Sequence, residues 1–434
     1  MKFFIFCLLI YIKIICSYIN IPFKTYKSDD INNLFYNFIY VNIDVGEPRQ
    51  NNSKLVLNQG SYPFVLYDKK IYSNVLYDSQ SSNKYIALEN NKFEVSSKSC
   101  KTGTYSMETF YIQNYKIDSC NFILCSKAKK EEYKLFDGQI GLNIGNDLVH
   151  DSNFVKLLKS KNIINNYIYS IYYINDDEGF LLLGEYPHNL NINLNLYKTS
   201  SDFKESNLLW VKSEIISKNI YWMILFDKIS YGQFYHAQRE AKLSFDIKYI
   251  ISTTQYHDNF KEIFGKKCEH ITFEEDFQGF KCRKDINKEL TPKIEFYNKE
   301  LNTTFTLDYK DLYMDKGNFS YFLVATYFDY DLGYWILGKP FMKKYLFLYN
   351  SDNKMIGFYK NSQYMNNGNT NKIDRYTISI CLNIFLALIL IILIFVFYHY
   401  YIKRRRIRAN ELEDKFNYVS KNDNNEHSNY SPIN

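Results

Sequence analysis

Several functional classes can be set aside because their sequence patterns are missing. The 434-residue chain contains no Cys-x-x-Cys pair and no spaced pair of histidines, so we expect no metal site. It has no Gly-x-Ser-x-Gly turn, and no cysteine stands in a recognisable catalytic setting. The formal net charge is +6, but no basic groove interleaved with aromatic residues accompanies it. We therefore expect neither a nucleic-acid partner nor a cofactor.

Apolar and aromatic side chains, in contrast, are plentiful. Hydrophobic residues make up 46% of the chain and aromatic residues 18%, which is more than a disordered chain carries. A chain of this length is sufficient for two packed lobes of ordinary size.

An apolar segment occupies each end of the chain. Residues 1–17 have one early lysine and then apolar runs, which is typical of a secretory signal peptide; Lys13 disfavours the alternative of a membrane anchor. Residues 377–398 form an uncharged apolar stretch of about 20 residues, enough to cross a bilayer. The alternative is a buried core helix, which would show a polar stripe. Here the polar side chains Ser379 and Asn383 both lie near the start.

Basic residues after the second apolar segment predict its orientation. Five of them follow at once: Lys403, Arg404, Arg405, Arg406 and Arg408. Such a cluster favours the cytosolic side of a membrane. The sequence thus predicts a single-pass type I protein of a secretory-pathway or cell-surface membrane, with its ectodomain lumenal or extracellular. Its membrane-proximal parts are a juxtamembrane linker (363–376), a transmembrane helix (377–398) and a polar cytosolic tail (399–434).

The cysteines of the predicted lumenal part would lie in an oxidising compartment, where disulfides form. Cys268 and Cys282 close a short loop, and we predict that they pair. The pairing among Cys100, Cys120 and Cys125 stays open, because an odd total leaves one thiol free or paired between chains. Three sequons make candidate glycosylation sites of Asn51, Asn302 and Asn318.

Short apolar runs separated by Gly, Pro, Asn and Asp predict an all-β body with a few short helices. The expected strands are 38–45, 167–174, 180–183, 222–229, 242–245 and 343–349. Apolar residues at helical spacing predict helices in 153–161 and 256–264.

The two halves of this body echo one another. Gln139-Ile140-Gly141 in the first half has a counterpart in Ile336-Leu337-Gly338 in the second. This predicts a duplicated architecture, with a short N-terminal segment (18–35), a first lobe (36–195) and a second lobe (196–362).

Several segments, in order along the chain, resemble motifs of the pepsin-like aspartic peptidases. They are Ile43–Gln50 (I-G-x-G-T-P-x-Q in the family), Phe136–Leu142 (F-D-G-I-L-G-L), Gly179–Gly184 (G-x-L-x-L-G), Tyr221-Trp222 with Phe226–Ile229, and Tyr334–Phe341 with Met355–Phe358 (W-I-L-G-x-x-F and I-G-F). The resemblance covers about residues 35–360. It implies a bilobal acid-protease fold, in which two β lobes face each other across a cleft and each contributes an Asp-Thr/Ser-Gly turn.

The chemistry of that family needs both turns. One carboxylate takes a proton from water while the other, protonated, polarises the peptide carbonyl. Two carboxyls held close share one proton, because both cannot easily ionise, and they titrate as a unit.

This sequence departs from the family at both turns. The first is Asn58-Gln59-Gly60, where the resemblance implies Asp, and an amide cannot exchange a proton at working pH. For the second, the resemblance points to Asp246-Ile247-Lys248, where the aspartate is retained but the bracing hydroxyl and the glycine are lost. The tyrosine-bearing Y-G-T-G hairpin of the family has only a loose match in residues 100–104, with Tyr105 out of register.

Three hypotheses follow for function. In one, the protein has a structural or trafficking role, in which the tail and the membrane anchor matter and the cleft is vestigial; the other two concern the cleft. The first is an inactive pepsin-like homologue that is membrane-anchored and binds a peptide or protein partner in the cleft between its lobes. The second is an active aspartic-type endopeptidase of the secretory pathway that uses Asp246 and another group in place of Asn58. Asp44 and Asp68 are the nearest first-lobe carboxylates in sequence, and His236 and His257 lie in the second lobe. A second acidic group or histidine within hydrogen-bond reach of Asp246 would favour this alternative.

Overall fold

The structure of the protein is a computed structural model. It describes residues 18–26, 35–59, 64–70, 75–88, 93–94, 100–113, 115–128, 136–143, 153–190, 204–213, 222–273, 277–327, 332–363, 398, 400–405 and 410. The predicted signal peptide (1–17), the boundary between the predicted lobes (191–203) and nearly all of the predicted membrane segment and tail lie outside these residues. The chain divides into one compact unit, residues 1–366, and a second, residues 367–434.

Strands from both halves of the first unit form one large sheet. Its strands run in the order β12-β24-β23-β10-β11-β1-β2-β3-β9-β4-β8-β7-β5, and β6 also pairs with β7. Their bounds are β1 (Ile19–Thr25), β2 (Ile39–Val45), β3 (Gln50–Asn58), β4 (Val65–Tyr67), β5 (Ile86–Ala87), β6 (Phe93–Glu94), β7 (Cys100–Ile112), β8 (Tyr115–Ala128), β9 (Gly138–Gly141), β10 (Ile168–Tyr173), β11 (Glu178–Leu183), β12 (Leu208–Lys212), β23 (Tyr345–Asn350) and β24 (Met355–Gln363).

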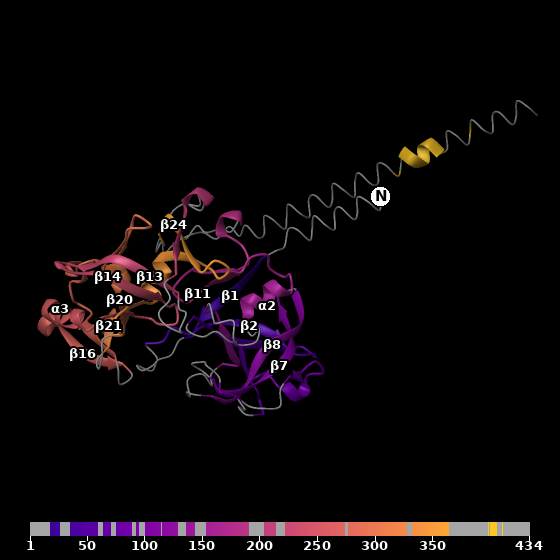
Figure 1. Ribbon diagram of the computed structural model, residues 1–434, viewed down its shortest axis with the longest axis horizontal. Coiled ribbons are helices and arrows are strands. Elements are labelled where there is room, and N and C mark those ends of the chain that lie inside the picture. Colours follow the sequence, from indigo (N-terminus) through magenta and orange to yellow (C-terminus); the bar gives the residue numbers. More distant parts are fainter. Residues whose placement is uncertain are drawn as a thin grey trace, which may run out of the picture. The chain divides into compact units, whose positions relative to one another are not determined.

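A second sheet is built from the second half alone, in the order β16-β17-β21-β15-β22-β14-β13-β18-β19, with β20 pairing with β21. Its strands are β13 (Met223–Tyr231), β14 (Phe234–Leu243), β15 (Ile250–Ser252), β16 (Cys268–Phe273), β17 (Phe277–Arg283), β18 (Ile294–Asn298), β19 (Thr303–Leu307), β20 (Tyr313–Lys316), β21 (Phe319–Tyr327) and β22 (Trp335–Leu337). Figure 1 shows β13, β14, β20 and β21 in one lobe and β2, β7 and β8 in the other.

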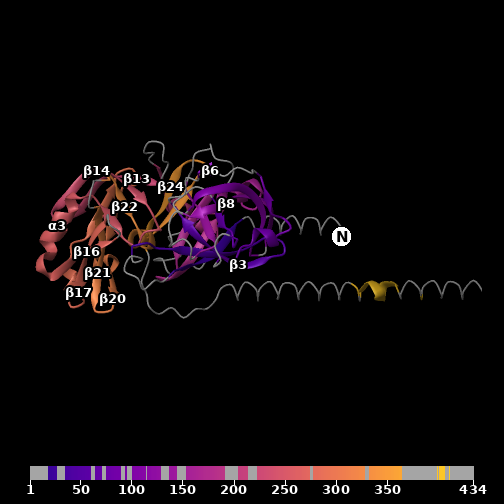
Figure 2. The same cartoon turned by 90° about the horizontal axis from the view of Figure 1, so that it is seen from below.

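The two lobes are joined through the large sheet. Strand β10 of the first half pairs with β23 of the second, with Ile168 opposite Asn350, and β24 carries β12 on its other side. In Figures 1 and 2, β24 lies between the two groups of strands. Every residue of β10 is buried, which explains its near-continuous apolar sequence.

Five of the six strands predicted from the sequence are confirmed, with ends that shift by one or two residues, whereas the predicted strand 242–245 contains only the last two residues of the longer β14. In β2 the buried residues Ile39, Val41, Ile43 and Val45 alternate with more exposed ones, as a strand with one buried face requires. The N-terminal segment 18–35 contributes more than the sequence indicated. Its strand β1 lies between β11 and β2, with Ile21 opposite Leu181.

Both predicted helices are also present. Helix α2 (Phe154–Ser160) begins after Asn153, whose side-chain oxygen accepts a hydrogen bond from the Lys156 backbone N–H. Helix α3 (Gln255–Phe264) buries Tyr256, Phe260 and Phe264 along one side. Two shorter helices, α4 (Tyr309–Leu312) and α5 (Lys339–Lys344), occur in the second half.

The helices and strands described above do not test the predicted transmembrane helix. No helix among the described residues is long and apolar enough to cross a membrane. Of the segment 377–398, only Tyr398 is described.

Candidate functional site

Each lobe places a turn at the end of a strand that pairs in parallel with the echoed glycine motif. In the first lobe, β3 runs parallel to β9, and Asn58 lies opposite Gly141. In the second lobe, β14 runs parallel to β22, and Leu243 lies opposite Leu337. One residue further along these strands, Ser244 comes level with Gly338.

The neighbouring antiparallel strands give the same alignment of the two lobes. Val65 pairs with Gln139, and it lies seven residues after Asn58. Ile251 pairs with Ile336, and it lies seven residues after Ser244. By strand register, the counterpart of Asn58 is therefore Ser244, and Asp246 lies two residues further along.

The residues that follow these two positions are in contact. The Gln59 side-chain oxygen accepts a hydrogen bond from the Phe245 backbone N–H at 3.2 Å, and both residues are buried. The reciprocal bond cannot form, because the Phe245 side chain has no acceptor. Asn37 adds a second link by donating from its side chain to the Phe245 carbonyl at 2.6 Å.

Neither equivalent position carries a carboxyl group. The buried Asn58 amide donates to Gln139 Oε1 at 3.3 Å. The buried Ser244 hydroxyl donates to Asp246 Oδ1 at 2.8 Å, while the Asp246 carbonyl accepts from the Asn37 N–H at 2.8 Å. Asp246 itself is half-buried.

Three buried tyrosines, Tyr169, Tyr173 and Tyr349, lie close to the joined turns. Burial raises the pKa of all three phenols well above the ordinary value, and the nearby charge of Asp246 raises these pKa values further. Tyr169 and Tyr349 stack at 4.7 Å between ring centroids, and Tyr169 donates to the Leu142 carbonyl at 2.7 Å. These phenols therefore stay protonated at neutral pH. Tyr169 donates a hydrogen bond, whereas the Tyr173 hydroxyl accepts one from the Asn37 side-chain amide at 3.2 Å.

The remaining turn residues lie at the junction of the lobes. Ile247 forms an isolated bridge with Tyr36, and the Lys248 N–H donates to the Phe35 carbonyl at 2.9 Å. The Lys248 side chain is half-buried. Burial and the nearby Lys339 and Lys316 lower its pKa to about 8. Gly60 lies outside the described residues.

A comparison with protein families identifies this architecture. The model of the family described as eukaryotic aspartyl protease matches residues 38–361, which is more than half of the chain. The chain belongs to the eukaryotic aspartyl protease family. This confirms the resemblance to pepsin-like peptidases. Among curated proteins, none matches the chain.

The chain departs from the pattern of this family at the two turns of the site. The assignment of Asp246 to the catalytic pair rested on residue type, since Asp-Ile-Lys contains the aspartate of Asp-Thr-Gly. The register instead equates Ser244 with Asn58. The sequence did contain a signal for this alignment. Asn58 and Ser244 each lie seven residues before a residue that pairs with the glycine motif of its own half, Val65 in the first and Ile251 in the second.

The other carboxylates considered as replacements for the missing aspartate have local partners. Asp44 accepts hydrogen bonds from Arg49 Nε and the Asn52 N–H, both at 2.6 Å. Asp68 accepts from the Ser79 hydroxyl and from the Lys70 N–H. Asp44 lies near the end of β2 and Asp68 directly after β4, and both carboxylates are engaged by groups of the first lobe. Neither has a hydrogen bond to Asp246 among the described contacts.

The histidines of the second lobe also have partners of their own. His257 Nδ1 lies 3.0 Å from the Thr326 hydroxyl, and the His257 ring stacks on Phe280. The His236 ring packs edge-on against Tyr256. No cluster of three or more His, Cys, Asp or Glu suited to a metal occurs among the residues that the structure describes.

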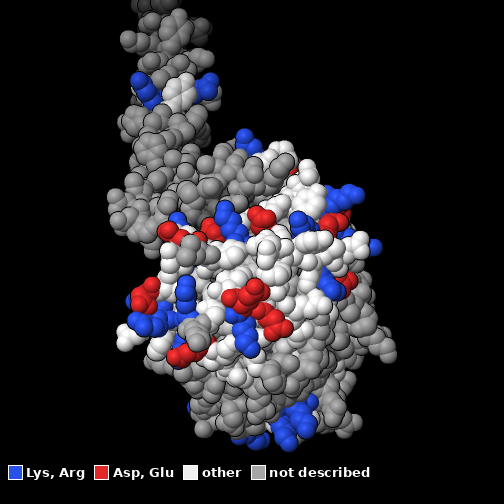
Figure 3. All heavy atoms as spheres, turned by 90° about the vertical axis from the view of Figure 1, so that its left-hand side faces the viewer, with Lys and Arg blue, Asp and Glu red and all other residues white. Residues whose placement is uncertain are grey.

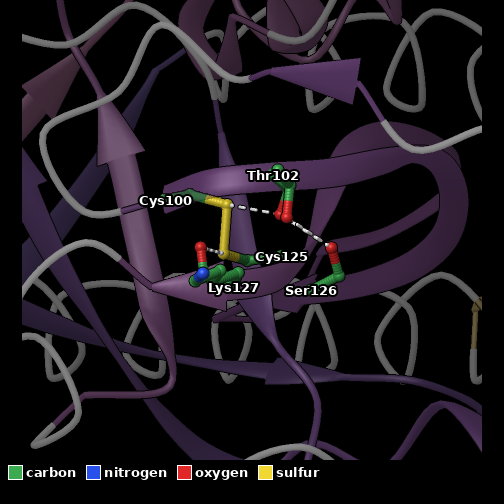
Figure 4. Close-up of a disulfide and its surroundings, with 5 residues drawn as sticks. All are labelled: Cys100, Thr102, Cys125, Ser126 and Lys127. Atoms are coloured by element: carbon green, nitrogen blue, oxygen red, sulfur yellow. Dashed lines mark hydrogen bonds between the residues drawn. A yellow bond between two sulfur atoms is a disulfide. The ribbon is translucent and has the colours of Figure 1, made fainter.

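Two disulfides constrain the body. The predicted Cys268–Cys282 bond is confirmed and joins β16 to β17. The second links Cys100 of β7 to Cys125 of β8, beside a 2.9 Å contact between the Thr102 and Ser126 hydroxyls (Figure 4). Cys100 begins the segment that resembles the family's Y-G-T-G hairpin, so this bond ties the start of that segment to β8.

Cys120 is the unpaired thiol among the described cysteines. Burial raises its pKa to about 12, which keeps it protonated and unreactive at neutral pH.

The three sequon asparagines are exposed. Asn51 is the second residue of β3, Asn302 lies in the turn between β18 and β19, and Asn318 lies in the turn between β20 and β21. Exposure is a requirement for a glycan, and the glycosylation of these residues stays a prediction.

Proposed function

We propose that this protein is a non-catalytic member of the aspartyl protease family, which binds a peptide or protein partner through the cleft between its lobes. One observation carries the proposal: the two residues that strand register makes equivalent, Asn58 and Ser244, are an amide and a hydroxyl. An amide and an aliphatic hydroxyl cannot share a titrating proton at working pH, so the acid and base of the family reaction are both missing.

The packing around these positions supports binding rather than a vestigial fold. Gln59 still joins the two turns by a hydrogen bond, Asn37 links the segment before β2 to the second turn, and the nearby tyrosines Tyr169, Tyr173 and Tyr349 are buried. A cleft that keeps the packing of the family but lacks its catalytic acid and base can still bind a ligand.

The alternative function is an aspartic-type endopeptidase. The observation that favours it is Asp246, a half-buried carboxylate at the lobe junction that accepts a hydrogen bond from Ser244. It requires a second acid, and the carboxylates of Asp44 and Asp68 are engaged by other groups of the first lobe. We therefore rank it second.

Membrane anchoring is part of the same proposal. The apolar segment 377–398 and the basic cluster that follows it support a single-pass protein with its lobes on the lumenal or extracellular side. The two disulfides support an oxidising compartment for residues 100–282.

A proteolysis assay tests the proposal. The full-length protein in detergent would be incubated from pH 4 to pH 7 with a diverse peptide library, beside an Asp246→Ala variant and beside pepsin as a positive control. We expect no cleavage by either form of this protein. Cleavage that disappears in Asp246→Ala would establish the alternative, and the same library passed over the immobilised protein would report binding directly.

A further inference from the structure

Helix α3 of the second lobe packs on the hairpin of β16 and β17 and on β21. In Figures 1 and 2, α3 lies beside β16. His257, Phe260 and Phe264 recur at helical spacing and therefore lie along one side of α3. Phe260 and Phe264 pack against Phe280 of β17 and Phe322 of β21, with ring centroids 4.8–6.4 Å apart. The same side of the helix therefore brings His257 to the sheet.

A second histidine meets His257 at this contact. Strand register places His270 of β16 opposite Phe280 of β17. The ring centroids of His257 and His270 lie 5.3 Å apart, and the two rings pack against Phe280 at 5.6 Å and 4.8 Å. His257 Nδ1 also contacts the Thr326 hydroxyl at 3.0 Å, which holds its ring against β21. Two imidazoles from different elements are thus held side by side around one aromatic ring.

The environment of His257 disfavours its charged form. His257 is half-buried, whereas His270 is exposed. Burial, and then the nearby His270, lower the pKa of His257 below its ordinary value of 6.5; Lys261 acts in the same sense and Asp258 in the opposite one. An undocked α3 would bind this proton more readily, so docking of the helix weakens as pH falls through 6.5.

The other charged groups on the elements around the two histidines are few. Lys281 and Arg283 of β17 pair with Glu269 and Asp285, at 2.9 Å and 3.0 Å. Lys267 follows α3 in η6 (Gly265–Lys267), and the sequence of β21 contains no charged residue. Figure 3 views the molecule from the side on which Figure 1 shows α3, and basic and acidic side chains of the described residues lie interspersed there.

We propose that His257 and His270 form an acid-sensitive contact, which holds the first turns of α3 on the hairpin at neutral pH and releases them when both imidazoles are protonated. One imidazolium is tolerated, because the face of Phe280 attracts a cation. Two imidazolium ions with ring centroids 5.3 Å apart repel each other, and the partial burial of His257 limits screening by salt. The Cys268–Cys282 bond joins β16 to β17, so the hairpin stays intact while α3 moves. The second lobe would then respond to the pH of its compartment.

Hydrogen exchange of the full-length protein in detergent tests this response. Peptides that span α3 would be followed by mass spectrometry at pH 7.0 and pH 5.0, with labelling times scaled to the chemical exchange rate at each pH. We expect the protection of α3 to fall about tenfold at pH 5.0, because like charges 5.3 Å apart near a protein surface repel to that order. Peptides that span α2, which contains no histidine, are the internal reference and should change by less than about twofold.

Variants connect the response to the pair of histidines. His270→Gln removes the exposed member, so the protection of α3 should become the same at both pH values. His236→Gln is the matched control, because the His236 ring also packs against α3, edge-on to Tyr256, and this variant should keep the response. Residues 274–276, between β16 and β17, and the Lys266 side chain lie outside the described part of the chain, and their charges are common to all the proteins compared.

Two results would overturn the acid-sensitive contact. One is equal protection of α3 at pH 7.0 and pH 5.0 in the unchanged chain. The other is a loss of protection at pH 5.0 that persists in His270→Gln, because a single imidazole or a group elsewhere would then carry the response. Either result leaves the proposed binding function standing, since the exchange of α3 is measured without a ligand in the cleft.

Discussion

The hydrogen bond between Gln59 and Phe245 offers a quantitative test of the lobe junction. In Gln59→Met the side chain keeps a similar volume but loses its acceptor, so packing is largely preserved. The Phe245 N–H, buried with its residue, is then left without its side-chain partner. An unsatisfied buried donor costs about 1–3 kcal/mol.

Residue-resolved hydrogen exchange measures this cost where it arises. Hydrogen exchange reports the effect at the amide itself, whereas a melting curve averages it over both lobes. If the Phe245 amide exchanges through local opening, about 1–3 kcal/mol corresponds to a roughly 5- to 150-fold loss of protection. The matched control is Gln113→Met, which removes an exposed side-chain bond to the Asn20 carbonyl and should change stability by less than about 0.5 kcal/mol. Unchanged protection at Phe245 would refute the view that Gln59 holds the two turns together.

Two further predictions concern charge and covalent links. Burial and neighbouring lysines lower the Lys248 pKa from 10.5 to about 8, so its charged form is disfavoured in the fold. The penalty is complete below pH 8 and disappears as pH rises towards 10.5, because the unfolded chain then binds more protons. Melting curves should therefore show Lys248→Met to be more stable at pH 7, by up to about 3 kcal/mol, with the difference vanishing above pH 10.5. Replacing Cys100 and Cys125 by serine should cost about 3.5 kcal/mol and replacing Cys268 and Cys282 about 3 kcal/mol, from sequence separations of 25 and 14 in the chain-entropy model. Denaturant unfolding of the two double variants checks this order, and a larger loss for the shorter loop would contradict it.

The sequence predicted the elements better than their pairing. Alternation in β2 and helical spacing in α3 are local patterns, and both elements form where they were expected. The Cys268–Cys282 bond was also predictable, because the two cysteines lie at the ends of adjacent strands joined by a short loop. The membrane segment and the signal peptide stay predictions.

What the sequence did not reveal depends on long-range register. Cys100 pairs with Cys125 because β7 and β8 form a long hairpin, and nothing in the spacing chooses Cys125 over Cys120. The role of β1 could have been anticipated from Ile19, Ile21 and Phe23, which alternate with polar or exposed residues. Its place between β11 and β2, however, is set by pairing with residues far along the chain.

The position of Ser244 shows why residue type misleads at this site. An aspartate two residues away satisfies a motif search, whereas the fold aligns positions by their strand partners, and those partners equate Ser244 with Asn58. This difference has an energetic consequence. Two carboxyls at equivalent buried positions would have to share a proton, and the junction of the lobes would weaken or tighten with pH. With an amide and a hydroxyl there instead, the contact between Gln59 and Phe245 needs no proton at those positions. Burial and neighbouring lysines lower the pKa of Lys248 at the junction to about 8, so a partner bound there should respond to pH through Lys248 rather than through a catalytic pair.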